Sequence, residues 1–311
     1  MKGLDWRYRV LAGIPFFNPG ISSMSDIAHL RARHDRAPRW ATGRPASGVV
    51  NRHLRLPPPH TSLRVRVDEP TERCDGPLPL IVYVHGGAWM FSDMDTPEWL
   101  TTRVARQTPS IVASVEYRLA PEHPFPAAVE DCCHAFSWLA EHAEQLGADS
   151  RRIAVMGDSA GGNLAAVLCL MARAREWPPI RHQTLIYPAL DLTLSSASID
   201  SEADHGFATR AQLETVRRLY LGEADATDWR ASPLHADLLK GLPAAHIIVA
   251  GHDPLRDDGI RYAKRLRDNN VRATLSTYAT MTHGFLALRF APTMRRRAVT
   301  AIVNEVAAAF S

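Results

Sequence analysis

The sequence has 311 residues, of which 46% are hydrophobic, so it can fill a large core, and α/β folds often reach this length as one unit. Its net charge is only +3 and its basic residues are scattered, which argues against nucleic-acid binding. Four cysteines are too few for a disulfide framework in a chain of this length, and a reducing compartment is the simpler interpretation. No apolar run reaches the roughly 20 residues that span a bilayer, and the first residues lack the cleavage pattern of a signal peptide. We therefore expect a cytoplasmic protein without stable membrane insertion.

The predicted elements begin with a helix and a strand pair and continue as an alternation of strands and helices. Ser25-Asp26 can cap a helix to about Arg36, and alternating apolar residues predict paired edge strands at Val49 to Leu56 and Leu63 to Val67. Apolar runs predict buried strands at Leu80 to Val84, Ser110 to Tyr117, Ile153 to Met156, Thr184 to Tyr187, His246 to Ala250 and Thr274 to Tyr278. The helices expected between and after them are about Pro97 to Gln107, Pro126 to Leu146, Ala160 to Arg175, Leu255 to Asn269 and Pro292 to Phe310. This order predicts an α/β fold with a mostly parallel central sheet and helices on both faces.

One stretch breaks the alternation. Asp191 to Leu242 is too long for a strand-to-helix connection and contains a helical segment of its own, Arg210 to Tyr220. We expect it to be an insertion above the carboxyl edge of the sheet. The predicted organisation is an N-terminal segment (1–48), a first part of the core (49–190), the insertion (191–242) and a second part of the core (243–311).

The sequence Gly157-Asp158-Ser159-Ala160-Gly161 stands between a predicted strand and a predicted helix. It fits the G-x-S-x-G nucleophile elbow, a strained turn that lifts a serine hydroxyl above the sheet, with glycines that prevent clashes. Ser159 is therefore the predicted nucleophile. The N-terminal amides of the following helix, that of Ala160 first, would point at the oxyanion of an acyl-transfer reaction.

A serine nucleophile needs a base, and the base needs an acid that orients it. Of the 14 histidines, His283 stands out because it follows the last predicted strand and precedes the closing helix. Asp253 follows the strand that ends at Ala250, whereas the competing acids Asp257 and Asp258 are expected to project from the start of a helix, where they complement its dipole. The chain order Ser159, Asp253, His283 is that of α/β-hydrolases.

A second contributor to the oxyanion site is expected after the strand that ends at Val84. His85-Gly86-Gly87-Ala88 resembles the HGGG-type loop, in which glycines let the backbone turn its amides inward. Alanine keeps its N–H, so Ala88 should matter only if that position requires a positive φ. His85 is expected to anchor the loop.

These motifs together resemble the bacterial hormone-sensitive-lipase-like esterases of the α/β-hydrolase fold, the GDSAG subtype. Besides the oxyanion loop and the serine motif, the resemblance covers Tyr117–Ala128 (YRLAPEHPFPAA), Tyr187-Pro188, Ala231–Leu234, Asp253–Gly259 and His283–Phe285. It implies a triad of Ser159, Asp253 and His283, with the amides of Gly86, Gly87 and Ala160 holding the oxyanion.

The resemblance also implies a helical cap over the active site, formed by the N-terminal segment and the insertion. It implies hydrolysis of short to medium acyl esters of small molecules without metal or organic cofactor, and many members form dimers, so a homodimer is a candidate assembly. Trp89, Asp158 and Tyr187 are the expected substrate contacts. Five cap side chains can be either core residues or acyl-chain contacts: Phe16, Phe17, Phe207, Leu213 and Trp229.

Two other functions remain open. An amidase, lactonase or deacetylase would use the same triad, because an acyl-enzyme does not specify its leaving group. A non-catalytic ligand-binding protein could reuse the fold, as plant gibberellin receptors resemble this family, although such a protein would be expected to have lost its base, and His283 is present. Metal-dependent hydrolysis is disfavoured, since the sequence has no HEXXH or CXXC pattern.

Overall fold

A computed structural model describes residues 4–5, 24–35, 42–58, 63–72, 76–202, 209–287 and 289–311. In these ranges the strands form an eight-stranded sheet in the order β1-β2-β4-β3-β5-β6-β7-β8. The strands are β1 (Val49–Arg55), β2 (Arg64–Pro70), β3 (Leu78–Val84), β4 (Ile111–Glu116), β5 (Ala148–Asp158), β6 (Ile180–Ile186), β7 (Ala244–His252) and β8 (Ala273–Thr282). All six strands predicted as buried and both predicted edge strands are present, but β8 is the last strand of the sheet and most of its residues are half-buried or exposed.

The six strands from β4 to β8 are parallel, while β1 and β2 are joined antiparallel at one edge. The central strand β3 pairs with β4 on one side and β5 on the other, for example Ile81 with Val112 and with Ala154. Parallel strands covered on both faces need near-continuous apolar sequences, which is why these strands could be found in the sequence. The predicted fold class is confirmed.

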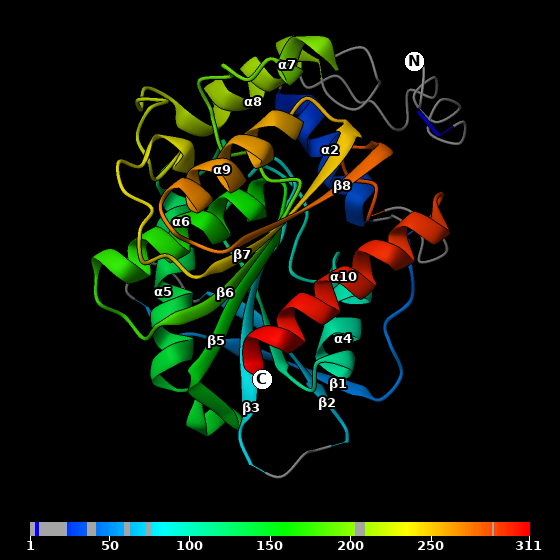
Figure 1. The fold of residues 1–311 in the computed structure, drawn as a ribbon, viewed down its shortest axis with the longest axis vertical. Helices are drawn as coiled ribbons and strands as arrows, with labels where there is room; N and C mark the ends of the chain where they lie inside the picture. Colours follow the sequence, from blue (N-terminus) through cyan, green and yellow to red (C-terminus); the bar gives the residue numbers. More distant parts are fainter. Residues whose placement is uncertain are drawn as a thin grey trace.

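Helices cover both faces of the sheet (Figure 1). On one face, α5 (Ala127–Glu141), α6 (Ala160–Ala174) and α9 (Arg256–Asp268) pack against the larger apolar cluster, which contains Leu80, Val82 and Val84. On the other, α4 (Glu98–Gln107) and α10 (Pro292–Phe310) pack against Ile81 and Tyr83. Alternate residues of β3 thus serve two cores, as the period of a strand requires.

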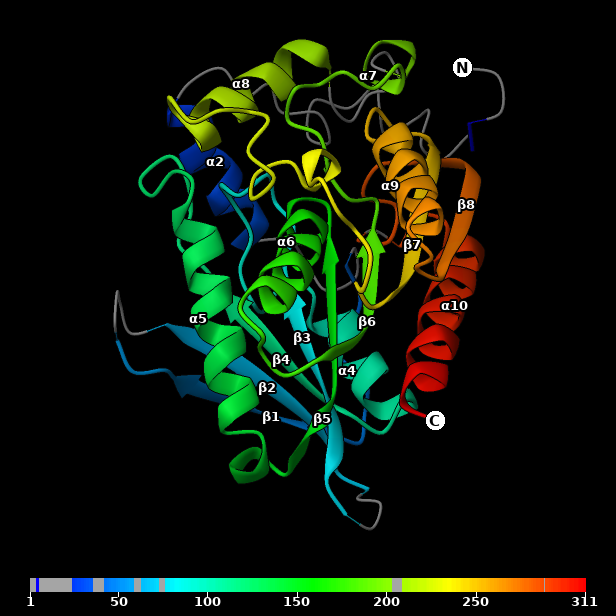
Figure 2. The same ribbon diagram turned by 60° about the vertical axis from the view of Figure 1, so that its left-hand side comes forward.

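The remaining helices lie beyond the carboxyl ends of the parallel strands (Figure 2). They are α2 (Met24–Asp35) from the N-terminal segment, and α7 (Ser198–Ser201) and α8 (Arg210–Leu221) from the stretch after β6. A capping box at Thr209 and Gln212 begins α8. The short 3-10 turns η1 (Glu144–Leu146) and η3 (Pro233–His235) complete the elements. Among the described helices, none combines the length and the apolar character that a bilayer span requires.

The stretch after β6 is fastened to the core through the start of α9. Asp258 is buried and accepts hydrogen bonds from the amides of Leu190 (2.9 Å) and Asp191 (3.1 Å) and from the hydroxyl of Ser196 (2.5 Å). Burial raises its pKa to about 7. Asp258 was expected to project from the helix start; that expectation is wrong, because its carboxylate faces inward and holds the strand-to-insertion connection.

Candidate active site

Ser159 lies in a turn between β5 and α6 that only small neighbours permit. Its φ of 54° is in the left-handed region, with ψ at −118°, and its amide donates to the carbonyl of Ile186 at 2.8 Å. A Cβ on Gly157 would lie 2.2 Å from the Gly161 oxygen, and one on Gly161 would lie 2.1 Å from the Val84 oxygen. Both glycines are therefore required by close backbone approach, as the elbow motif predicts.

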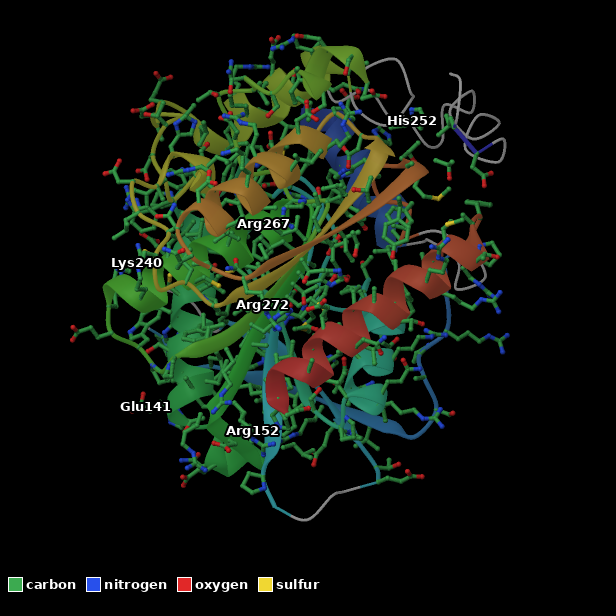
Figure 3. All side chains as sticks on the ribbon, viewed as in Figure 1. Glu141, Arg152, Lys240, His252, Arg267 and Arg272 are labelled. Carbon is green, nitrogen blue, oxygen red and sulfur yellow. The ribbon has the colours of Figure 1, made fainter. Side chains whose placement is uncertain are left out.

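The three predicted triad residues meet at the carboxyl edge of the sheet. The hydroxyl of Ser159 lies 2.9 Å from Nε2 of His283, and Nδ1 of His283 lies 2.9 Å from Oδ2 of Asp253. Asp253 is fully buried, and its other carboxylate oxygen accepts the amide of Leu255 at 2.8 Å. His283 is one-fifth exposed. His252, which precedes Asp253 and is labelled in Figure 3, pairs with Glu202 at 3.2 Å.

The charges around His283 favour its protonated form. Burial alone lowers the pKa of an imidazole, but the adjacent Asp253 carboxylate, with a smaller contribution from Asp158, outweighs burial, so the pKa of His283 is raised above its ordinary value. Tyr187 packs its ring edge-on against the imidazole, with 4.8 Å between ring centroids. The geometry thus links a hydroxyl, an imidazole and a buried carboxylate in the order that general-base activation of a serine needs.

The loop after β3 brings backbone amides towards the same edge, but not all the predicted ones. The amide of Gly86 donates to Oδ1 of Asp158 at 3.0 Å, so this amide is occupied, and its predicted oxyanion role stays a prediction. In the described part of the chain, the amides of Gly87 and Ala88 donate to no protein acceptor. Together with Ala160, the first residue of α6, they form the better candidate set. The sequence did not predict that the Ala88 amide belongs to this set; Ala88 adopts the positive φ of 54° that the loop requires at this position.

His85 anchors this loop, as expected. It is buried, its ring stacks on Tyr117 with 4.3 Å between centroids, and the Tyr117 hydroxyl donates to the His85 carbonyl at 2.9 Å. The Tyr83 hydroxyl, which the sequence did not single out, donates to Asp158 at 2.6 Å. Asp158 therefore holds β3 and the oxyanion loop together from behind the serine.

The three expected substrate contacts are buried or hydrogen-bonded within the protein, and their contact with a substrate stays a prediction. Asp158 is occupied by Tyr83 and Gly86, and Tyr187 is 3% exposed behind the imidazole. Trp89 is 2% exposed and stacks on Tyr220 of α8, with 4.2 Å between ring centroids. Of the suggested acyl-chain contacts, Leu213 and Trp229 pack against the larger apolar cluster. Phe16, Phe17 and Phe207 lie outside the described residues.

No group of three or more metal-ligating side chains occurs within the described ranges. Cys132, Cys133 and Cys169 are buried free thiols, and Cys74 lies outside these ranges. Burial raises the pKa of the Cys133 thiol to about 11, so it is a poor nucleophile at neutral pH.

A parallel doubly covered sheet with an elbow serine, an imidazole and a buried carboxylate at its carboxyl edge defines an α/β-hydrolase. A family model described as "alpha/beta hydrolase fold" matches residues 81–287. The carboxylic ester hydrolase LipN of Mycobacterium tuberculosis is 41% identical over 276 residues, covering 86% of this chain and 73% of its own. The carboxylesterase NlhH of the same species is 42% identical over 231 residues, covering 73% and 72%.

Solved structures of esterases are also similar to this chain. The hyperthermophilic esterase from the archaeon Pyrobaculum calidifontis superposes with a TM-score of 0.88 at 35% identity, covering 98% of both chains. A thermostable esterase from Pseudomonas putida superposes with a TM-score of 0.90 at 28% identity, covering 100% of this chain and 99% of its own. The chain belongs to the α/β-hydrolase family, in the hormone-sensitive-lipase-like esterase branch.

Proposed function

We propose that the protein is a serine carboxylesterase that hydrolyses short to medium acyl esters of small molecules through an acyl-enzyme on Ser159. The observation that carries the proposal is the continuous contact from Ser159 to His283 to Asp253, with 2.9 Å at both steps. The relatives' names, carboxylic ester hydrolase and carboxylesterase, support the ester as the substrate class. An intact base in contact with the serine also argues against a binding protein that has lost catalysis.

The reaction has two halves. Ser159 attacks the ester carbonyl while His283 takes its proton at Nε2, and the same nitrogen then returns a proton to the departing alcohol. Water next loses a proton to His283 and attacks the acyl-enzyme, which releases the acid and restores the serine. Asp253 keeps Nδ1 protonated and stabilises the imidazolium. The negative oxygen of each tetrahedral intermediate would be held by the amides of Gly87, Ala88 and Ala160.

The substrate is proposed to enter between the sheet edge and a cap made of the N-terminal segment 1–48 and the insertion 191–242. The position of α2, α7 and α8 beyond the strand ends supports this division (Figure 2). Esters of increasing acyl length would measure the depth of the site. Matched anilides would show whether the enzyme also releases an amine, and lactones would show whether it opens a cyclic ester. The expected cytoplasmic location and the candidate homodimer stay predictions, which cell fractionation and sedimentation can measure.

Removal of the nucleophile tests the proposal. Ser159→Ala should lower kcat for p-nitrophenyl butyrate by up to about a million-fold, because the covalent route is lost. Ser150→Ala, at the opposite end of the same strand β5, is the matched control and should keep the wild-type rate. Circular dichroism shows whether both variants are folded. Ester hydrolysis that survives intact in a folded Ser159→Ala variant would remove the assignment.

A further inference from the structure

The loop that carries the candidate oxyanion amides is strained. Gly87, Ala88, Trp89 and Ser92 all have positive φ, at 114°, 54°, 59° and 76°. Three of these residues are not glycine, and left-handed backbone is strained for such residues. Backbone strain of this kind persists only where surrounding contacts determine the conformation.

A side chain from the N-terminal segment reaches this loop. Arg31 of α2 donates from Nε to the carbonyl of Met90 at 2.8 Å and from Nη2 to the carbonyl of Ala120 at 3.0 Å. Its two terminal nitrogens also grip both carboxylate oxygens of Glu122, each at 2.7 Å. One guanidinium therefore joins the oxyanion loop to the loop that contains Ala120 and Glu122.

The two loops are also joined directly, and α2 itself is anchored. The amide of Ala120 donates to the carbonyl of Trp89 at 2.9 Å. Ile27, one turn before Arg31, is 1% exposed within the larger apolar cluster. The guanidinium thus extends from an anchored helix and donates to acceptors on both loops.

We propose that Arg31 is a positioning residue for ester hydrolysis: braced by Glu122, its guanidinium holds the Met90 carbonyl and thereby keeps the Gly87 and Ala88 amides directed at the oxyanion. This inference rests on the proposed function. It also makes the N-terminal helix part of the catalytic geometry, in addition to its place in the cap.

An arginine suits this task better than a lysine. The planar guanidinium offers donors in fixed directions, so it can serve two carbonyls and a bidentate carboxylate at once, whereas an ammonium is a point charge on a flexible stem. The hydrogen bond from Arg31 lowers the pKa of Glu122 to about 2, so the pair stays ionised throughout the range in which a histidine base works. A half-exposed ion pair contributes little to global stability, so its loss should be seen in the rate.

The test compares Arg31→Met and Arg31→Lys with Arg64→Met. Arg64 makes a similarly exposed pair with Glu116 where β2 meets β4, and its variant should keep the wild-type rate. Arg31→Met should lower kcat for p-nitrophenyl butyrate by about tenfold to a hundredfold with little change in KM, as small misplacements of catalytic groups do. Arg31→Lys should lie nearer to Arg31→Met than to the wild type. Active-site titration of Ser159 corrects each rate for the folded fraction.

Two further measurements separate positioning from simple structural support. The Ki of a trifluoromethyl ketone, which becomes tetrahedral on Ser159, should rise in parallel with the loss of kcat/KM. The double variant Arg31→Met/Glu122→Gln should be no slower than Arg31→Met, because both residues act as one unit.

The outcomes divide cleanly. The positioning role would be overturned if Arg31→Met kept the wild-type kcat per titrated site, or if Arg31→Lys were fully active. It would also be overturned if the Ki of the ketone did not change in Arg31→Met, or if the losses of kcat in the double variant were additive. If the wild-type protein hydrolyses no ester, or Ser159→Ala is as active as the wild type, the proposed function itself has failed.

Discussion

His283 at the carboxyl edge of the sheet and His182 in the interior of β6 are both enclosed by the fold, yet their surroundings act on them in opposite directions. His283 has the Asp253 carboxylate at 2.9 Å, and its pKa is raised. His182 is fully buried, and neither ring nitrogen has a hydrogen-bond partner in the described part of the chain. Burial, together with the charges of His246 and Arg272, lowers its pKa to about 3. A buried imidazole becomes a usable base only where a carboxylate accompanies it.

The carboxyl edge of the sheet and the interior of the sheet also differ in backbone strain. Five of the non-glycine residues with positive φ, Ala88, Trp89, Ser92, Ser159 and Tyr187, lie in the loops at the carboxyl edge. No residue within the eight described strands has a positive φ. The edge therefore concentrates both charge and strain, and the interior supplies the rigid packing that holds them.

Of the changes that bear on this contrast, the largest loss of activity is expected when the carboxylate of Asp253, which distinguishes the surroundings of His283 from those of His182, is removed. Asp253→Asn should lower kcat by about ten-thousandfold, because an amide no longer holds the imidazole in the required tautomer or stabilises its charge. Saturating p-nitrophenyl acetate kinetics measure the change. Asp257→Asn is the matched control, since Asp257 lies four residues later and accepts the Ser198 amide at 3.0 Å. An Asp253→Asn variant that matches the Asp257→Asn rate would show that another group orients His283.

The raised pKa of His283 predicts the acid limb of the activity profile. The base must be neutral, so kcat/KM should fall about tenfold per pH unit on the acid side, with a midpoint above the reference value of about 6.5. Asp158→Asn should move that midpoint downward, because Asp158 helps to raise the pKa. Rates measured between pH 5 and 9 test both statements. A midpoint well below 6.5 in the wild type would mean that burial outweighs Asp253.

Much of this contrast could be predicted from the sequence. Strand-end positions predicted that Ser159, Asp253 and His283 lie close together, because the carboxyl ends of parallel strands meet at one edge, and the glycines of the elbow motif predicted the sharp turn at Ser159. The positions of the strands along the chain also followed from their apolar and alternating patterns, whereas their order in the sheet was not predicted. These features depend on short-range patterns.

Features that depend on side-chain direction could not be predicted. Gly86 and Ala88 are neighbours in an HGGG-like loop, and only the actual φ values and the Asp158 contact show which amide is occupied. Arg31 is one of several arginines in its segment, and nothing local indicates that it reaches Glu122, 91 residues away. Asp258 sits in the first turn of α9 as expected, but tertiary packing turned it inward.

His182, in the interior of the sheet, should make the free energy of unfolding depend on pH. Since the folded pKa of His182 is about 3 and an unfolded histidine titrates near 6.5, only the unfolded chain gains a proton between these values, so stability is complete above about pH 6.5 and is lost as the pH falls. Between pH 7.5 and 5.0 this single group should cost about 2 kcal/mol of unfolding free energy.

Urea unfolding of His182→Leu at both pH values measures that term. The variant should lose about 2 kcal/mol less than the wild type on acidification. His123→Leu, at an exposed position, is the control, and its free energy of unfolding should fall as much as that of the wild type between pH 7.5 and 5.0. Equal losses in all three proteins would mean that His182 accepts a proton in the folded state.

The smallest expected effect concerns strain at the edge itself. Ala88 has φ of 54°, where glycine is at ease, so Ala88→Gly relieves roughly 1 kcal/mol of strain while giving the unfolded chain more freedom. The net change should be a stability equal to or up to about 1 kcal/mol above that of the wild type, with kcat retained because the amide remains. Ala211→Gly, at an exposed position in the first turn of α8, should be destabilised, since glycine in a helix costs up to about 1 kcal/mol. Urea unfolding of the two variants compares them directly. If Ala88→Gly were destabilised as much as Ala211→Gly, the positive φ of Ala88 would not be a source of strain in this loop.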